Sequence, residues 1–259
     1  MDARSVSDPA RQLLSQAGWL DSEIALHRSS RTHQERPGSV PGPHPGQSPL
    51  IVQLPAAGWP ADPFARLLAR RRSCRHFSQR ALRLHDLADV VIPAITTADD
   101  RPAQALPAAT PAISVYLLVH KVTWPDGAPL GQGIYRTDPR SGELVLVRAA
   151  EFAVLKHCAD LADLTAEPAA VLLLCLHMRA RRQYVNAYEL ALLEAGQLLQ
   201  NLSLTATSAQ VAACILGSVF DEPFWSLAGS DPSVAVEKHG TPIVAMALGY
   251  SDVEEGGSS

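Results

Sequence analysis

One long apolar segment, residues 186–210, constrains the fold of this chain more than any other feature. It reads NAYELALLEAGQLLQNLSLTATSAQ, and its Leu and Ala residues fall on almost every side of a helix with 3.6 residues per turn. A helix that is apolar nearly all round has to be covered on most sides by other elements. We therefore expect this helix to be buried in the centre of the fold.

The predicted strands are short and differ in how they are covered. Residues 169–178 (AAVLLLCLHM) form an unbroken apolar run, which predicts a strand covered on both faces. Further strands are expected at 113–122, 211–217 and 240–250, and residues 133–148 read as a hairpin with the turn DPRSG. Strands and helices mix without the strict alternation of a doubly wound parallel fold, so the predicted class is α+β.

The other expected helices and the domain limits follow from capping residues and composition. The helices run from an N-cap at Asp62 to Arg71 or Arg72, from 83 to near Pro93, over 151–163, and over 221–229 with Asp221 as the cap. Residues 1–60 are expected to hold a helical segment and a linker rich in Pro and Gly, 61–250 the main domain, and 251–259 a disordered tail.

Bulk properties exclude several classes of function. A net charge of −4 and a pI near 6.1 argue against a nucleic-acid or membrane-surface protein. The four cysteines lie far apart, so we expect neither a metal site nor a disulfide framework. No signal sequence or membrane-spanning apolar run is visible, which predicts a cytoplasmic protein.

A cluster of arginines interrupts this mildly acidic chain just after the first main-domain helix. Arg71, Arg72 and Arg75 surround Ser73, and forked guanidinium groups beside a hydroxyl can bind a phosphate monoester from several directions. Cationic side chains at the end of a helix also favour its dipole without any ligand. On these residues alone, a phosphate site and a solvated helix end both remain open.

The order of motifs around the cluster resembles a known family. RRSCRHF (71–77) is similar to the R-R-S-x-R-x-F signature of the nitroreductase superfamily, and LALLEAGQLLQNLSLTATS (190–208) is similar to its central helix. CILGSVFDE (214–222) resembles the segment that approaches the flavin ring, and PIVAMALG (242–249) the closing strand. LHRSSR (26–31) resembles an element of the SagB-type branch.

The resemblance implies a fold, a cofactor and a set of ligands. The fold would be nitroreductase-like, with a central, mostly antiparallel sheet around a long buried helix in an intertwined dimer. The cofactor would be FMN. Its ribityl phosphate would be bound by Arg71, Arg72, Ser73 and Arg75, and its ring would be approached by the backbone of Gly217 and Ser218.

The SagB-type branch implies an activity and partners. Its members are FMN-dependent dehydrogenases that oxidise thiazolines and oxazolines in ribosomal peptides to azoles. The implied partners are a second copy or a related chain, a precursor peptide and a cyclodehydratase. The positions of the family's catalytic Lys-Tyr pair fall at Arg182 and Gln183, with Tyr184 one position late. Arg182 and Tyr184 are the candidate catalytic residues. An Arg side chain can polarise the substrate, but it cannot act as a base near neutral pH.

The sequence also departs from the family. The stretch ALPAATPAIS (105–114) lacks the Ser and Gly that touch the flavin in family members. A second hypothesis therefore stands beside the enzyme, namely a catalytically degenerate subunit that acts as a partner or scaffold in a peptide-modifying complex.

Overall fold

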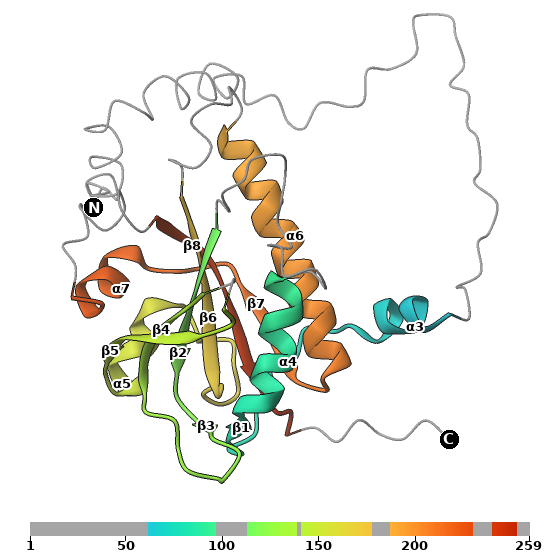
Figure 1. The fold of residues 1–259 in the computed structure, drawn as a ribbon, viewed down its shortest axis with the longest axis horizontal. Helices are drawn as coiled ribbons and strands as arrows, with labels where there is room; N and C mark the ends of the chain where they lie inside the picture. Colours follow the sequence, from blue (N-terminus) through green and yellow to red (C-terminus); the bar gives the residue numbers. More distant parts are fainter. Residues whose placement is uncertain (1–61, 97–112, 139–140, 178–186, 230–239, 253–259) are drawn as a thin grey trace, which may run out of the picture. The chain divides into compact units, whose positions relative to one another are not determined.

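A computed structural model describes residues 62–96, 113–138, 141–177, 187–229 and 240–252 (Figure 1). All of them belong to one compact unit, residues 59–259. The helices are α3 (Pro63–Arg70), α4 (Leu84–Ile95), α5 (Phe152–Leu155), the 3-10 turn η1 (Lys156–Cys158), α6 (Ala187–Ser208) and α7 (Asp221–Leu227). The strands are β1 (Leu82–Arg83), β2 (Ile113–Val119), β3 (Val122–Thr123), β4 (Gly133–Thr137), β5 (Leu144–Ala149), β6 (Ala170–Leu176), β7 (Ala212–Leu216) and β8 (Thr241–Gly249).

The main sheet is built around β6. Its strand order is β5-β4-β2-β6-β8-β7, and every neighbouring pair is antiparallel. The seven residues of β6 are all buried, because β2 and β8 pair with it along its length and helices cover both faces. The expected class, α+β with a mostly antiparallel sheet, is confirmed, and so is the strand buried on both faces.

The sheet forms the middle layer of the described residues (Figure 1). On one face, Leu172 and Leu174 of β6 pack with α4 and α6. On the other face, Val171 and Leu173 pack with α5 and α7. This alternation is the two-residue period of a strand. None of the helices in the described ranges is long and apolar enough to cross a bilayer.

The long helix α6 buries one side only. Ala191, Ala195, Leu198, Leu202 and Ala206 are buried, whereas Tyr188, Leu192 and Leu193 are exposed, Leu193 to 66%. The sequence predicts burial on nearly all sides, but within the described residues only one side of α6 meets the sheet and α4. On the exposed side these apolar residues lie beside polar ones, namely Glu189, Gln197 and Gln200.

Several boundaries agree with the sequence. The side chain of Asp62 caps α3 by accepting a hydrogen bond from Ala65 N at 3.0 Å, as expected. The β4–β5 hairpin closes where Gly142 N donates to the Asp138 carbonyl at 2.8 Å, and Gly142 has a positive φ of 70°. Residues 139 and 140 of that turn lie outside the described residues.

Other boundaries differ. Helix α4 continues past Pro93 to Ile95. The strand expected over 113–122 stops at Val119, because the next two backbone N–H groups, those of His120 and Lys121, both donate to the Ala169 carbonyl. The helix expected over 151–163 shortens to α5 and η1, since Ala159 forms a β-bridge with Val219 instead. The cap of α7 is Phe220, and Asp221 is already its first residue.

Beyond β8 the chain stays attached for two residues that the sequence assigns to the tail. Ser251 forms a β-bridge with Phe77, and Asp252 N donates to the His76 carbonyl at 3.3 Å. Residues 253–259 lie outside the described residues.

A buried carboxylate joins the end of the sheet to α4. Asp86, only 6% exposed, receives two hydrogen bonds from the Arg83 guanidinium, at 2.7 and 2.8 Å, and one from the Tyr250 hydroxyl. Burial alone would raise the pKa of Asp86, but the hydrogen bonds from Arg83 and Tyr250 outweigh burial and lower it. The guanidinium of Arg80 lies 3.8 Å above the Tyr250 ring and holds the same ring from outside.

Replacing Tyr250 by Phe should destabilise the fold. The change leaves the buried Asp86 carboxylate one donor short, which costs about 1–3 kcal/mol of the free energy of unfolding. Urea unfolding of the wild type and Tyr250→Phe measures the difference. Tyr188→Phe, which alters an exposed tyrosine of α6, is the control. Equal losses in the two variants would contradict a stabilising role for the Tyr250 hydroxyl.

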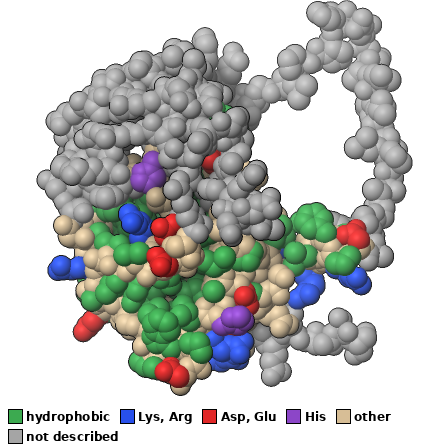
Figure 2. Space-filling model, viewed as in Figure 1, with side chains coloured by type: hydrophobic (Ala, Val, Ile, Leu, Met, Phe, Trp, Pro, Cys, Tyr) green, Lys and Arg blue, Asp and Glu red, His purple; other side chains and the backbone are tan. Residues whose placement is uncertain are grey.

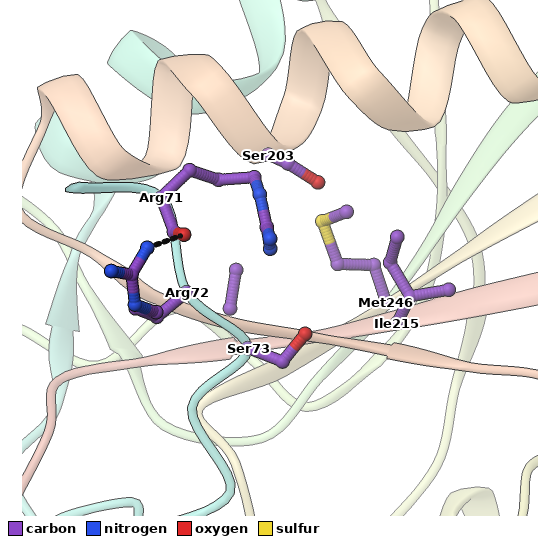
Figure 3. A pocket seen from close by; sticks show the side chains of 7 residues that line it. Arg71, Arg72, Ser73, Ser203, Ile215 and Met246 are labelled. Atoms are coloured by element: carbon purple, nitrogen blue, oxygen red, sulfur yellow. Dashed lines mark hydrogen bonds between the residues drawn. The ribbon is translucent and has the colours of Figure 1, made fainter. Parts of the chain in front are cut away.

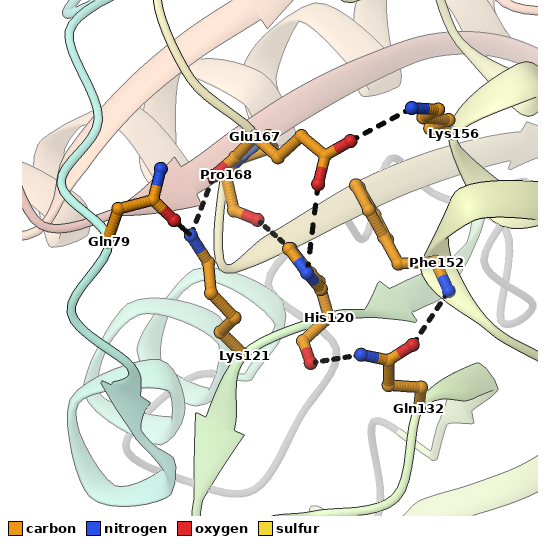
Figure 4. A network of polar contacts seen from close by, with 8 residues as sticks. All are labelled: Gln79, His120, Lys121, Gln132, Phe152, Lys156, Glu167 and Pro168. Carbon is orange, nitrogen blue, oxygen red and sulfur yellow. Dashed lines mark hydrogen bonds and ion pairs between the residues drawn. The ribbon is translucent and has the colours of Figure 1, made fainter.

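A second polar network connects the residues just before β6 with those just after β2 (Figure 4). The His120 ring stacks on Phe152 with 4.2 Å between ring centroids, and its Nδ1 lies 3.1 Å from the Pro168 carbonyl. Glu167 accepts a hydrogen bond from Lys156 Nζ at 3.0 Å, and its other oxygen lies 3.8 Å from His120 Nε2. Lys121 Nζ donates to the Glu167 carbonyl at 3.1 Å.

The titrating groups of this network should make stability depend on pH. Burial lowers the pKa of His120 below its ordinary 6.5, and the hydrogen bond from Lys156 lowers the pKa of Glu167 below its ordinary 4.5. The unfolded chain therefore binds more protons than the folded chain as the pH falls through each ordinary value. The free energy of unfolding should be highest above 6.5, and should fall first through the His120 range and again through the Glu167 range.

Urea unfolding between about pH 8 and pH 4 measures this profile. In Glu167→Gln the acidic fall should shrink, while the fall near the ordinary pKa of histidine should remain. In His120→Gln the fall near the ordinary pKa of histidine should disappear. His85→Gln, which alters a mostly exposed histidine of α4, is the control and should keep that fall. A profile in Glu167→Gln that matches the wild type would rule out this carboxylate as its source.

Candidate functional site

The arginine cluster lies along the edge of the sheet formed by β7. Helix α3 ends at Arg70, and from Arg71, with ψ of 121°, the chain becomes extended. Cys74 N donates to the Ala213 carbonyl at 2.8 Å, and Ser78 N donates to the Tyr250 carbonyl at 2.8 Å. The main-chain bonds thus fix residues 71–78 beside β7 and the end of β8.

A small cavity lies between this segment, the sheet and α6 (Figure 3). Its volume is about 10 Å³, room for about one water molecule. The residues that line it come from four parts of the chain: Arg71, Arg72, Ser73, Ser203, Ala213, Ile215 and Met246. The hydroxyls of Ser73 and Ser203 and the guanidinium of Arg71 therefore lie beside an apolar surface, which Ala213, Ile215 and Met246 form.

The predicted phosphate ligands differ in where they point. Arg71 reaches across the cavity toward Ser203, and the Ser73 hydroxyl faces the same space (Figure 3). Arg72 turns back toward α3, where its Nη1 donates to the Ala69 carbonyl at 2.6 Å and to the Arg71 carbonyl at 2.9 Å. In this arrangement Arg72 satisfies carbonyls at the end of the helix.

Arg75 does not line the cavity. Its carbonyl accepts hydrogen bonds from the backbone N of Thr165 at 3.0 Å and from the Thr165 hydroxyl at 3.2 Å. Its guanidinium acts on Cys214: burial raises the pKa of that thiol, and the positive charge of Arg75 partly offsets the rise. Cys214 packs on the α7 face of the sheet, so Arg75 is placed apart from the cavity residues.

Within the described residues, neither Arg71 nor Arg75 forms an ion pair with a carboxylate. Their positive charges are therefore available to an anion. This distinguishes them from Arg83, whose guanidinium is engaged by Asp86.

Gly217 and Ser218 follow β7 directly. Gly217 lies two residues beyond Ile215, about 7 Å along the strand direction. It is exposed, and a Cβ built on it would meet nothing within 4 Å, so the space above this backbone is open. The Ser218 carbonyl accepts a hydrogen bond from Asp160 N at 3.0 Å, which fastens this loop to the turn after η1.

These residues suit the phosphate end of a flavin mononucleotide better than its ring end. Arg71, Ser73 and the open backbone at Gly217 supply charge, hydroxyl and access along a single strand edge. The cavity is far too small for a flavin ring, whereas the backbone at Gly217 is exposed and has open space above it. The candidate catalytic residues Arg182 and Tyr184 lie outside the described residues. Residues 105–112 of the altered loop do so as well.

Sequence reasoning missed the far wall of the cavity. Ser203 is on the buried side of α6, 7% exposed, and Met246 is in β8. A serine on the apolar side of a helix is the one signal that could have drawn attention to Ser203. Nothing in the spacing of the motifs indicates that it lines the same cavity as Arg71, because their placement depends on how α6 crosses the sheet.

Comparisons with solved structures find the same fold in other proteins. A chain of the Escherichia coli microcin synthetase McbBCD complex, solved with truncated pro-MccB17 bound, is 18% identical with a TM-score of 0.61, over 87% of this chain and 81% of that one. A nitroreductase-like protein from Ralstonia eutropha is 20% identical with a TM-score of 0.58, over 84% and 97%. At these identities the likeness shows a shared fold.

The sequence itself gives the family. No curated protein is significantly similar to the chain. Residues 68–250, which begin inside α3 and end after β8, match the nitroreductase family. More than half of the chain is covered, and the match includes both the arginine segment and the loop after β7. The chain therefore belongs to the nitroreductase family, whose members bind flavin.

Proposed function

We propose that this protein is an FMN-dependent dehydrogenase that oxidises azoline rings in a ribosomally synthesised peptide to azoles. The observation that carries the proposal is the placement of Arg71, Ser73 and the open Gly217 backbone beside β7 in a nitroreductase-family fold. Support for a peptide substrate comes from the fold shared with a chain of the McbBCD complex, which was solved with a pro-peptide.

In this proposal the chain's own residues divide the work. Arg71 and Ser73 bind the phosphate, Arg75 contributes positive charge from the α7 side, and the Gly217–Ser218 backbone lies against the ring. When bound, FMN would supply the acceptor for the hydride that leaves the azoline ring. Removal of the proton from the neighbouring carbon needs a base, for which Tyr184 is the candidate, while Arg182 polarises the substrate.

A second chain would complete the site. The exposed side of α6 carries Tyr188, Leu192 and Leu193, and apolar residues at this spacing form a stripe that suits packing against another protein. Hydrophobic side chains reach the surface at other places too, and Figure 2 shows many of them on one face of the described part. We propose that α6 packs against a second copy or a related chain, and that a cyclodehydratase prepares the peptide.

The purified protein should be yellow, with the absorbance of an oxidised flavin, and should release FMN when denatured by heat. Adding a thiazoline-containing peptide without oxygen should bleach the flavin, and mass spectrometry should find the loss of a pair of hydrogens from each oxidised ring. A protein that stays colourless with excess FMN would overturn the enzyme proposal and favour the partner or scaffold role.

Replacing Arg71 by Ala should weaken FMN binding by about 10- to 100-fold, because a charged hydrogen bond to phosphate is lost. Quenching of flavin fluorescence during titration measures the dissociation constant. Arg70→Ala is the matched control, since Arg70 ends α3 and does not line the cavity. If the two variants bind FMN equally well, the phosphate has been assigned to the wrong residues.

Replacing Leu193 by Glu should reduce association between chains. The side chain is 66% exposed, so a charge is tolerated by the isolated chain but not in an apolar interface. Light scattering during gel filtration measures the mass. Val145→Glu, on the exposed edge strand β5, is the control. An unchanged mass in Leu193→Glu would place the interface away from this stripe.

A further inference from the structure

Ser203 occupies an unusual place on α6. It lies on the buried side of the helix between apolar neighbours such as Leu199 and Leu202, and it is 7% exposed. A hydroxyl in such a position needs a hydrogen-bond partner, and Ser203 Oγ donates to the Leu199 carbonyl at 2.8 Å. That bond uses its only hydrogen and leaves the oxygen's lone pairs at the cavity wall.

The two threonines in this half of α6 have structural roles. Thr205 donates to the Val90 carbonyl at 2.7 Å and ties α6 to α4. Thr207 donates to the Ser203 carbonyl at 2.8 Å. Neither of them lines the cavity, whereas Ser203 faces Arg71 across it (Figure 3). Ser203 is therefore the hydroxyl of this helix that is placed to meet a ligand of the arginine segment.

The bond to Leu199 can be given up at low cost. Within the helix the Leu199 carbonyl is also the regular acceptor for the backbone N–H of Ser203. If the Ser203 hydroxyl rotates into the cavity, that carbonyl keeps its backbone partner and no buried acceptor is orphaned. The hydroxyl can then donate to an anion held by Arg71.

From this geometry we infer that Ser203 is a further phosphate ligand, which binds the cofactor's phosphate from α6, opposite the segment 71–73. The inference rests on the proposed FMN site and extends it to a residue outside the arginine segment. A phosphate is larger than the present cavity, so the Arg71 side chain that crosses this space has to move aside when the phosphate enters. The anion is then held by donors from two separate elements, over an apolar floor of Ala213, Ile215 and Met246.

Riboflavin, which lacks the phosphate, separates this role from a general effect on the fold. Ser203→Ala should weaken FMN binding by about 5- to 10-fold and leave riboflavin binding unchanged, as measured by quenching of flavin fluorescence. Ser208→Ala, an exposed serine at the end of the same helix, should bind both flavins like the wild type. Alanine favours helices, and circular dichroism checks that Ser203→Ala remains folded.

The other outcomes overturn the inference in different ways. Equal weakening for FMN and riboflavin would move the Ser203 contact from the phosphate to the ribityl chain or the ring. An unchanged affinity for FMN in Ser203→Ala would show that the Ser203 hydroxyl does not contact the phosphate and serves only its hydrogen bond to Leu199. A wild-type protein that binds neither flavin would instead overturn the proposed function itself, so the two failures are distinct.

Discussion

The pairing of β6 with β2 and β8 is the constraint on which the rest of the structure depends. Seven consecutive residues of β6 lose contact with water, and their backbone groups find partners only if strands lie on both sides. Their side chains then require cover on both faces, which α4 and α6 provide on one face and α5 and α7 on the other. The sheet reaches β7 through β8, and β7 supplies the edge beside which the arginine segment lies.

The two edges of the sheet have different surroundings. Beside β7, residues 71–78 add main-chain bonds and bring Arg71 and Ser73 to the cavity. At the opposite edge, β5 presents Val145, Leu146 and Val147 to solvent within the described part of the chain. Catalytic or binding residues placed beside an edge strand can be changed without disturbing the buried strands, because few core contacts depend on them.

Local patterns in the sequence predict those parts of the fold whose cause is local. The apolar run of β6, the turn at Gly142 and the Asp62 cap each depend on residues close together in the chain, and all three are confirmed. The break after Val119 and the short α5 depend on the Ala169 carbonyl and on Val219, which lie far away in the sequence, so no local signal announces them. The candidate site divides in the same way: Arg71 and Ser73 share a motif, whereas Ser203 joins them only through the crossing of α6 and the sheet.

The order of the strands also shapes how the chain reaches this fold. After β6 the chain forms α6 and β7 before it arrives at β8, the strand that completes the cover of β6. Contacts between such distant segments form slowly, because the loop between them must close first. Until β8 arrives, one side of a wholly apolar strand is unpaired and can associate with other chains. The feature that secures the finished core is thus also the point at which a folding chain is most exposed to aggregation.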